Sequence, residues 1–155
     1  MAGIKQRIIT GTLQRYWRMQ RALTMGAQGL VLDPEGRILL IKATYKPGWQ
    51  FPGVGVERNE TVRTAVEREL EEETGVILDG EPLLFSLYAN FRSFPSDHIA
   101  LFVVRQWRRP VVPAPNREIA ASAFFARDAL PADTVGSVHR RLAEVLDGGR
   151  PDVNW

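Results

Sequence analysis

Three glutamates with helical spacing lie in "RELEEETGV", residues 68–76. On a helical wheel, Glu72 and Glu73 flank Glu69 at roughly 60° and 40°, so all three share the side that carries the apolar residues of the segment. Grouping ionised carboxylates where they are partly desolvated is costly unless a partner compensates. Mg²⁺ can compensate, because it is held by a few carboxylates together with substrate phosphates. The spacing therefore predicts a metal site, whereas an ordinary acidic helix would turn these side chains to water.

The helix that positions these carboxylates is predicted from its two ends. Asn59 is a good N-cap residue, and Glu60 after it suits the positive end of the helix dipole. Gly75 is the residue type that commonly follows the last helical turn. Arg68 and Glu72 are spaced for an ion pair at i,i+4, but one arginine cannot neutralise the whole cluster.

Apolar runs separated by turn residues predict the surrounding elements. Two strands, 25–32 and 37–43, flank "DPEG" and are predicted to form a β-hairpin. Strands and helices mixed with hairpins favour an α/β sandwich over a purely parallel sheet. The further elements predicted along the chain are strands within 82–91, 98–107 and 122–126 and a last helix from near Asp133 to "DGG".

The composition bounds the class of protein. A chain of 155 residues fits one domain with a substantial core. No run approaches the roughly 18 apolar residues of a membrane helix, and the N-terminus lacks the apolar region and cleavage site of a secretory signal. Cysteine is absent, which excludes disulfides, thiolate chemistry and cysteine zinc sites. We therefore expect a cytoplasmic protein, and the net charge of +2 is too small to predict nucleic-acid binding by itself.

A basic segment opens the chain. Its cations all precede the first acidic residue, Asp33: Lys5, Arg7, Arg15, Arg18 and Arg21. Such a segment could attract a membrane surface, a nucleic acid or a polyphosphate. The favoured interpretation is a solvated helix that docks on the domain or on a second subunit. We therefore expect a helical extension at residues 1–23.

The stretch "VGVERNETVRTAVERELEEETGV", Val54 to Val76, resembles the signature of the Nudix hydrolase family, G-x5-E-x7-R-E-U-x-E-E-x-G-U, where U is aliphatic. The residues that match it in register are Glu60, Arg68, Glu69, Leu70, Glu72, Glu73, Gly75 and Val76. The order of elements from about Thr24 onward is also similar to that of the family. The resemblance implies a Nudix-type α/β/α sandwich with a mixed β-sheet over residues 24–148, followed by a tail at 149–155.

One position departs from the signature, because Val54 stands where its first glycine is expected. A β-branched residue disfavours positive φ, so we expect an extended backbone at Val54. In the family, a backbone carbonyl from this glycine pair joins the metal ligands, and Gly53 can still supply it. The departure therefore concerns the geometry of the loop rather than the carboxylates.

The resemblance implies hydrolysis of a diphosphate by water attack at phosphorus, with bound Mg²⁺ or Mn²⁺. Position by position, it makes Glu72 and Glu73 metal ligands and Glu69 a ligand or the general base. Arg68 would orient a glutamate through its fork of donors. Some members recruit a further glutamate from a late loop, and Glu118 is the candidate here for the base or an extra ligand. The alternative for Glu118 is a salt bridge to a nearby arginine.

Specificity is expected from residues outside this motif. Trp49 and Phe51 lie immediately before the catalytic loop, and Arg92 lies in the connection "NFRSFPSDH". An aromatic ring can stack on a base or sugar, and an arginine can bind a phosphate bidentately. We predict that these three residues bind the substrate, with simple packing as the alternative for Trp49.

The reaction implied is cleavage of a phosphoanhydride bond in a nucleoside diphosphate linked to another group, and a nucleotide sugar such as ADP-ribose is favoured. The alternatives are an oxidised nucleoside triphosphate as the substrate, or a nucleotide-binding module on the same fold without catalysis. We expect a small-molecule nucleotide as the partner, neither nucleic acid nor membrane, and a monomer or homodimer.

Overall fold

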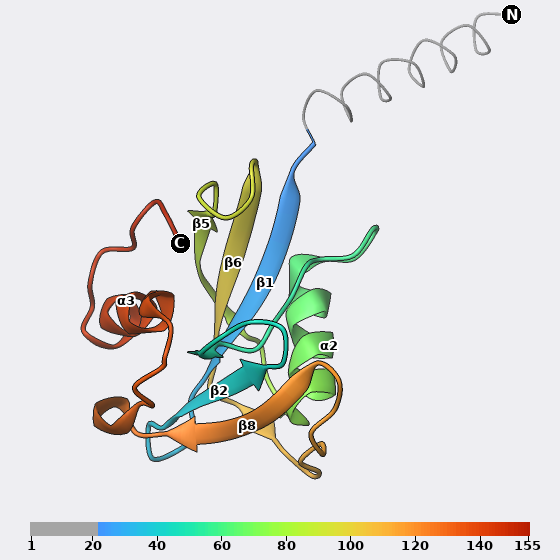
Figure 1. Ribbon diagram of the computed structural model, residues 1–155, viewed down its shortest axis with the longest axis vertical. Coiled ribbons are helices and arrows are strands. Elements are labelled where there is room, and N and C mark those ends of the chain that lie inside the picture. The colour runs from blue at the N-terminus through green and yellow to red at the C-terminus, as the bar shows by residue number, and fades with distance from the viewer. Residues whose placement is uncertain (1–21) are drawn as a thin grey trace, which may run out of the picture.

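The computed structural model describes residues 22–155 (Figure 1), so the helical extension predicted for residues 1–23 lies outside the described residues except for its last two. The strands are β1 (Thr24–Val31), β2 (Ile38–Ala43), β3 (Trp49–Gln50), β4 (Ile77–Leu78), β5 (Leu83–Ala89), β6 (Asp97–Val104), β7 (Trp107–Arg108) and β8 (Ile119–Phe125). The helices are α2 (Val62–Thr74), α3 (Gly136–Leu146) and the short 3₁₀ helix η1 (Arg127–Ala129). Within residues 22–155, no helix is long and apolar enough to cross a membrane.

A mixed three-stranded sheet forms the centre of the domain, in the order β1-β6-β5. β1 runs parallel to β6, from the pair Thr24 and Asp97 to the pair Val31 and Val104, whereas β5 runs antiparallel to β6. A second, antiparallel sheet has the order β3-β2-β8, and β4 pairs with β7. The parallel and antiparallel pairs in one sheet confirm the predicted α/β class with a mixed sheet.

β1 and β2 lie where the sequence predicts strands, but they do not form the predicted hairpin. The turn between them is held by Asp33, whose carboxylate accepts hydrogen bonds from the backbone N of Arg37 at 2.7 Å and from its Nε at 2.6 Å. The two strands meet at a single bridge between Leu32 and Ile38. They then part, because β1 pairs with β6 and β2 pairs with β3 and β8. The turn residues determine the reversal of the chain, whereas the pairing depends mainly on strands far along the sequence.

α2 and α3 cover opposite faces of the central sheet (Figure 1). On one face, Val66 and Leu70 of α2 pack with Ala27 of β1. On the other face, Val138 of α3 packs in a cluster with Leu30 of β1. β1 can serve both clusters because successive side chains of a strand point to opposite faces. This arrangement confirms the expected α/β/α sandwich.

The two ends of α2 are satisfied by local groups. Thr61 is the N-cap, and its hydroxyl accepts a hydrogen bond from the backbone N of Thr64 at 3.0 Å. Asn59, the predicted N-cap, instead has φ +65° in the turn before the helix. That prediction was two residues early, because asparagine also suits a left-handed turn. Gly75 ends the helix as predicted, with φ +75° and its N–H donated to the backbone O of Glu71.

The C-terminal tail packs against the domain. The backbone N of Ala89 in β5 donates to the O of Val153, and the N of Trp155 donates to the O of Ala89. The Trp155 ring meets the buried ring of Tyr88 edge to face, with centroids 5.4 Å apart. The tail therefore extends the edge of the central sheet.

Candidate functional site

Arg68 gathers two of the carboxylates that the sequence brings together. Its Nε and Nη2 donate to the two oxygens of Glu60 at 2.9 and 3.0 Å, and its Nη1 contacts Glu69. Hydrogen bonds from Arg68 hold the pKa of Glu60 below its usual range. Burial raises the pKa of Glu69, which is 6% exposed, against the lowering effect of Arg68. Arg68 therefore links Glu60, which precedes α2, to Glu69 within α2. Glu69 is one of the glutamates that the sequence analysis expects an arginine to orient.

Glu73 lies one turn further along α2 and faces the loop that precedes the helix. Its Oε2 accepts a hydrogen bond from the backbone N of Gly53 at 2.7 Å. Burial, followed by the nearby charges of Glu69, Glu118 and Glu72, raises the pKa of Glu73 to about 7, against the hydrogen bond from Gly53. Deprotonated Glu73 thus has no neutralising cation beside it among residues 22–155.

The loop that carries Gly53 is attached to β1. The backbone N of Ala27 donates to the O of Val54 at 3.0 Å, and the N of Val56 donates to the O of Met25 at 2.7 Å. Gly53 has φ +131°, and a Cβ there would lie 2.1 Å from the O of Ala27. Val54 does not have a positive φ, in line with the expectation for a β-branched residue. The strained position of the loop is therefore Gly53, and the valine next to it is tolerated.

Glu72 and Glu118 approach the site from its solvent side. The side chain of Glu72 is 63% exposed and reaches Nη1 of Arg68 at 3.5 Å, so it does not share the inward position that the helical wheel predicts. Glu118 is exposed, and its charge acts on Glu73. Within residues 22–155 it makes no ion pair, and Arg109 instead donates to the backbone O of Thr74 at 2.6 Å. The alternative of a salt bridge from Glu118 to a nearby arginine is thus not seen in this structure.

The chemistry of these donors suits a hard divalent cation. They are carboxylate oxygens together with the backbone carbonyl of Gly53, which are the oxygen ligands that Mg²⁺ prefers. Across residues 22–155, no three acidic or histidine side chains converge closely enough as they stand to hold an ion. Glu69 is engaged by Arg68, and Glu73 by the N–H of Gly53. A metal ion would therefore compete with these two hydrogen bonds for the same carboxylates.

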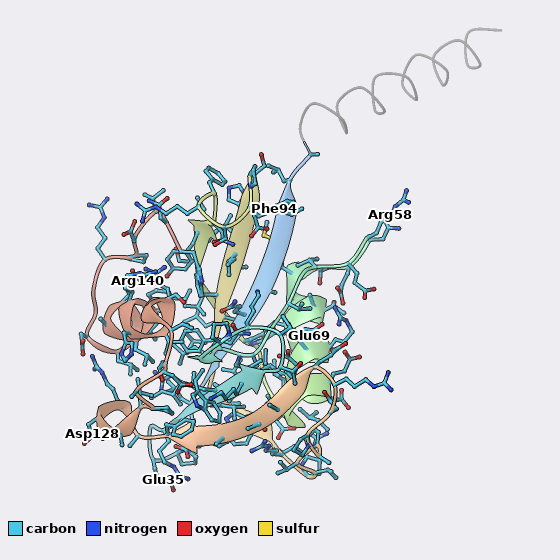
Figure 2. All side chains as sticks on the ribbon, viewed as in Figure 1. Glu35, Arg58, Glu69, Phe94, Asp128 and Arg140 are labelled. Carbon is cyan, nitrogen blue, oxygen red and sulfur yellow. The ribbon has the colours of Figure 1, made fainter. Side chains whose placement is uncertain are left out.

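A cleft of about 600 Å³ lies beside the Gly53 loop. Its lining residues come from β1, the segment after β2, the loop before α2 and the facing ends of β5 and β6. They include Gly26, Gln28, Tyr45, Lys46, Gln50, Gly53, Gly55, Arg58, Asn90, Asp97 and Ile99. Figure 2 labels Glu69 on α2 and Arg58 at the outer tip of the loop that precedes the helix. The cleft and the carboxylates therefore meet at one loop.

The structure does not bring the three predicted substrate residues together. Phe51 is fully buried in the cluster on the α3 face, so it has no surface to offer a ligand. Trp49 packs edge to face on Phe125, with centroids 4.8 Å apart, as the packing alternative expects. Arg92 is exposed on the connection between β5 and β6, outside the lining of the cleft. Trp49 and Phe51, the "W-x-F" pattern, did not identify the cleft, because aromatic side chains pack in protein cores as readily as they line clefts.

Four cleft residues lie where the sequence suggests no role. Tyr45 is exposed on the rim, and burial together with the charges of Glu73, Glu118 and Glu69 raises its pKa, which places it beside the carboxylates. The others are the side-chain amides of Gln28, Gln50 and Asn90. The sequence could have indicated Gln28 as a cleft residue, since it is a polar residue within the apolar part of β1. The other three required the tertiary structure.

Comparison with known proteins points to one family. A family model described as "NUDIX domain" matches residues 22–146. The curated relatives include an RNA pyrophosphohydrolase of Hydrogenovibrio crunogenus, 32% identical over 82 residues, 53% of this chain and 47% of that protein. They also include an 8-oxo-dGTP diphosphatase of Proteus vulgaris, 33% identical over 88 residues, 53% of this chain and 76% of that protein. An ADP-ribose pyrophosphatase of Methanocaldococcus jannaschii is 37% identical over 76 residues, 47% of this chain and 44% of that protein.

A solved structure gives the same indication over a longer stretch. The crystal structure of a MutT NUDIX hydrolase from Burkholderia pseudomallei superposes with a TM-score of 0.67 and 28% identity, covering 79% of this chain and 97% of that one. By contrast, this chain spans less than half the length of two of the three curated relatives, 47% and 44%. The names of the three relatives indicate three different substrates.

Proposed function

The chain belongs to the NUDIX domain family, and on that premise we propose that it is a metal-dependent pyrophosphohydrolase that cleaves a phosphoanhydride bond in a nucleotide. The observation that carries the proposal is Glu73: burial and three neighbouring carboxylates raise its pKa to about 7, and no cation among residues 22–155 forms an ion pair with it. Arg68 is already committed to Glu60 and Glu69. An arrangement of this kind is stabilised by a bound divalent ion.

Glu72, Glu73, Glu69 and the carbonyl of Gly53 are the proposed ligands of Mg²⁺ or Mn²⁺. When bound, the ion would polarise phosphoryl oxygens and acidify water. Arg68 orients Glu69 through its Nη1 while its other nitrogens hold Glu60. Either Glu69 or Glu118 takes the proton from the attacking water. Glu118 suits that role because it is exposed, close enough for its charge to act on Glu73, and unpaired within residues 22–155.

A nucleoside diphosphate linked to a second group, such as ADP-ribose, is the substrate class that we favour. A cleft of about 600 Å³ beside the carboxylates has room for such a nucleotide. Lys46 and Arg58 on its lining are cations suited to phosphate. An oxidised nucleoside triphosphate is the second candidate, and the relative named 8-oxo-dGTP diphosphatase favours it.

We further propose a small-molecule nucleotide as the partner, a monomer or homodimer, and a cytoplasmic location. Since a relative is named RNA pyrophosphohydrolase, an RNA 5′ end is included among the substrates to be tested. The proposed division of the chain remains an extension at 1–23, a hydrolase domain at 24–148 and a tail at 149–155.

The test is product release from a panel of ADP-ribose and other nucleotide sugars, oxidised and ordinary nucleoside triphosphates, and an RNA with a 5′-triphosphate. Each is incubated with Mg²⁺, with Mn²⁺ and with EDTA, and the products are separated by chromatography. We expect metal-dependent turnover of a nucleotide sugar, abolished by EDTA. No turnover across the panel, with nucleotide binding intact, would overturn the hydrolase proposal in favour of a non-catalytic binding module.

A further inference from the structure

We propose that Asn90 determines base specificity by accepting a hydrogen bond from an N–H donor of the nucleobase, and that Asp97 is the residue that positions it. The inference rests on the proposed function, because it assumes that the cleft holds the nucleoside part of a nucleotide. Asn90 follows β5, Asp97 begins β6, and both line the cleft. Phe94 lies in the turn between them and is labelled in Figure 2.

The backbone first fixes where Asn90 stands. Its N donates to the O of Asp97 at 2.8 Å, and its O accepts from the N of Ser93 at 3.0 Å and the N of Phe94 at 3.1 Å. These hydrogen bonds close the turn between β5 and β6. The Cα of Asn90 is therefore held by the turn and by β6, and its side chain reaches the cleft from a defined position.

The side chain of Asp97 then fixes which atom Asn90 offers. Nδ2 of Asn90 donates to Oδ2 of Asp97 at 2.7 Å, and Oδ1 of Asp97 accepts from the hydroxyl of Thr24 at 2.7 Å. A carboxylate accepts hydrogen bonds and does not donate them, so the amide must turn its NH₂ group to Asp97. Oδ1 of Asn90 makes no hydrogen bond to any residue in 22–155 and is left as an acceptor.

Two glycines, Gly26 and Gly55, line the same cleft as Asn90 and leave part of its surface without side chains. Gly26 of β1 and Gly55 of the loop face each other across a bridge, and Ile99 of β6 lies beside Gly26. A Cβ built on Gly55 would meet no atom within 4 Å, and one on Gly26 would make only ordinary contacts. The space above Gly55 is therefore open, and at Gly26 the lining carries no side chain of its own beside Ile99. A planar heteroaromatic ring fits such a surface, and its edge can carry the N–H that Asn90 accepts.

An acceptor held in one orientation discriminates more strongly than a freely turning amide. An amide that can rotate would satisfy a donor or an acceptor on the base equally well. Asn90 cannot exchange the positions of Oδ1 and Nδ2 while one N–H of its amide donates to Asp97, so the position of Oδ1 offers an acceptor only. Bases with an N–H at that edge should then bind about tenfold more tightly than a base without one, because a buried hydrogen bond contributes about one such factor.

The experiment measures binding of AMP, GMP, IMP and purine riboside 5′-monophosphate to the full chain in EDTA by calorimetry. Purine riboside has no N–H on its base, whereas the other three do. We expect the tightest of these three to bind about tenfold more strongly than purine riboside 5′-monophosphate. In Asn90→Leu this ratio should fall to about one. In the isosteric Asp97→Asn, whose amide can also donate, Asn90 is free to turn over and the ratio should fall as well.

Two further variants separate base recognition from general effects. Gly55→Val adds bulk to this part of the cleft without a polar group, so it should weaken binding of all four monophosphates. Gln106→Leu removes an exposed amide beyond the opposite end of β6, and it should leave the ratio unchanged. Thermal unfolding of each variant shows that it is folded.

Four results would overturn the inference. The first three are equal binding of all four monophosphates by the wild type, an undiminished ratio in both Asn90→Leu and Asp97→Asn, and no binding of any probe. Unchanged affinities in Gly55→Val would also overturn it. EDTA removes hydrolysis from this measurement. A negative result in the binding measurement therefore does not test hydrolysis, which the substrate panel tests separately. A negative result in the substrate panel likewise does not change the binding affinities measured in EDTA.

Discussion

Glu73 holds a negative charge in surroundings that disfavour it. The largest cause is burial, and the carboxylates of Glu69, Glu118 and Glu72 add to it, so that the pKa of Glu73 reaches about 7. A proton and a metal ion therefore compete for this side chain near neutral pH. We expect metal affinity to fall as the pH drops below about 7, the value given by the environment of Glu73.

Glu73→Gln should remove hydrolysis and stabilise the metal-free fold. Loss of a proposed metal ligand should lower kcat/KM by roughly a hundredfold or more. A raised pKa means that the native state binds the proton more tightly than the unfolded state. The wild type therefore loses stability as the pH rises from about 4.5 to about 7. In EDTA at pH 8 the variant should be more stable than the wild type by about 2 kcal/mol in the free energy of unfolding. This is less than the whole pKa shift of Glu73 would give, because solvent screens part of the interaction.

The matched control is Glu71→Gln, which changes an exposed glutamate of the same helix. It should keep both the turnover and the pH dependence of unfolding, which is followed by urea titration at pH 4.5 and pH 8. Wild-type turnover in Glu73→Gln would show that the metal assignment is wrong. A stability difference that does not change with pH would show that burial of the charge at Glu73 is not the cause.

At the scale of elements, the site depends on where α2 ends. Gly75 has a left-handed backbone, and a Cβ there would lie 1.9 Å from the backbone O of Val111. The residue therefore ends the helix and also lets the loop after β7 pass close to it. That loop leads on to Glu118 and β8. Gly75 thus affects both the end of α2 and the path of the loop that leads to Glu118.

Gly75→Ala should destabilise the protein more than Gly148→Ala. Both glycines have positive φ, +75° and +69°, so each alanine incurs the cost of a left-handed backbone, about 1 kcal/mol. Only Gly75 of this pair has a neighbour within 4 Å of the added Cβ. We therefore expect a loss of roughly 1 kcal/mol at Gly148 and about 2–4 kcal/mol at Gly75. Urea unfolding of both variants measures the difference, and equal losses would show that the contact with Val111 relaxes at no cost.

At the scale of the whole molecule, a buried ionic network ties the last helix and the tail to the central sheet. Arg141 of α3 is fully buried, and its Nη2 donates to Oε1 of Glu144 at 2.7 Å. Oε2 of Glu144 accepts from the hydroxyl of Tyr88 in β5 at 2.8 Å. The guanidinium lies 4.2 Å from the centroid of the Tyr88 ring and 5.3 Å from that of Trp155. Nε of Arg141 has no hydrogen-bond partner among residues 22–155, so the network depends strongly on the contacts that remain.

Glu144→Gln should destabilise the whole domain by about 3–5 kcal/mol, because it leaves the buried charge of Arg141 without a counter-ion. The control is Asp147→Asn, which breaks the exposed ion pair of the same helix with Arg127 and should change the stability little. Thermal and urea unfolding compare the two variants. If both lose the same small amount, the buried pair contributes no more than the exposed one.

Much of the carboxylate cluster could be predicted because it lies within one short segment. The spacing of residues 60–76 determined that a helix forms, that it ends at Gly75 and that Arg68 lies near Glu69. Helical geometry relates residues at most four positions apart, and such relations can be read along the chain. The start of the helix was misplaced, because Asn59 and Thr61 are both good N-caps and only their backbone angles separate them.

What only the tertiary structure decided joins residues that are distant in sequence. β1 takes β6 as its partner instead of β2, Asp97 binds both Asn90 and Thr24, and Glu144 of α3 accepts a hydrogen bond from Tyr88 of β5. Residue type alone also did not show that Phe51 belongs to the hydrophobic core. An aromatic side chain is stabilised by burial in a core and by burial against a ligand. The sequence by itself determined the family and indicated the carboxylates that we propose as the site. The cleft and its specificity depend on which distant surfaces pack together, and the spacing of residues along a chain does not contain that information.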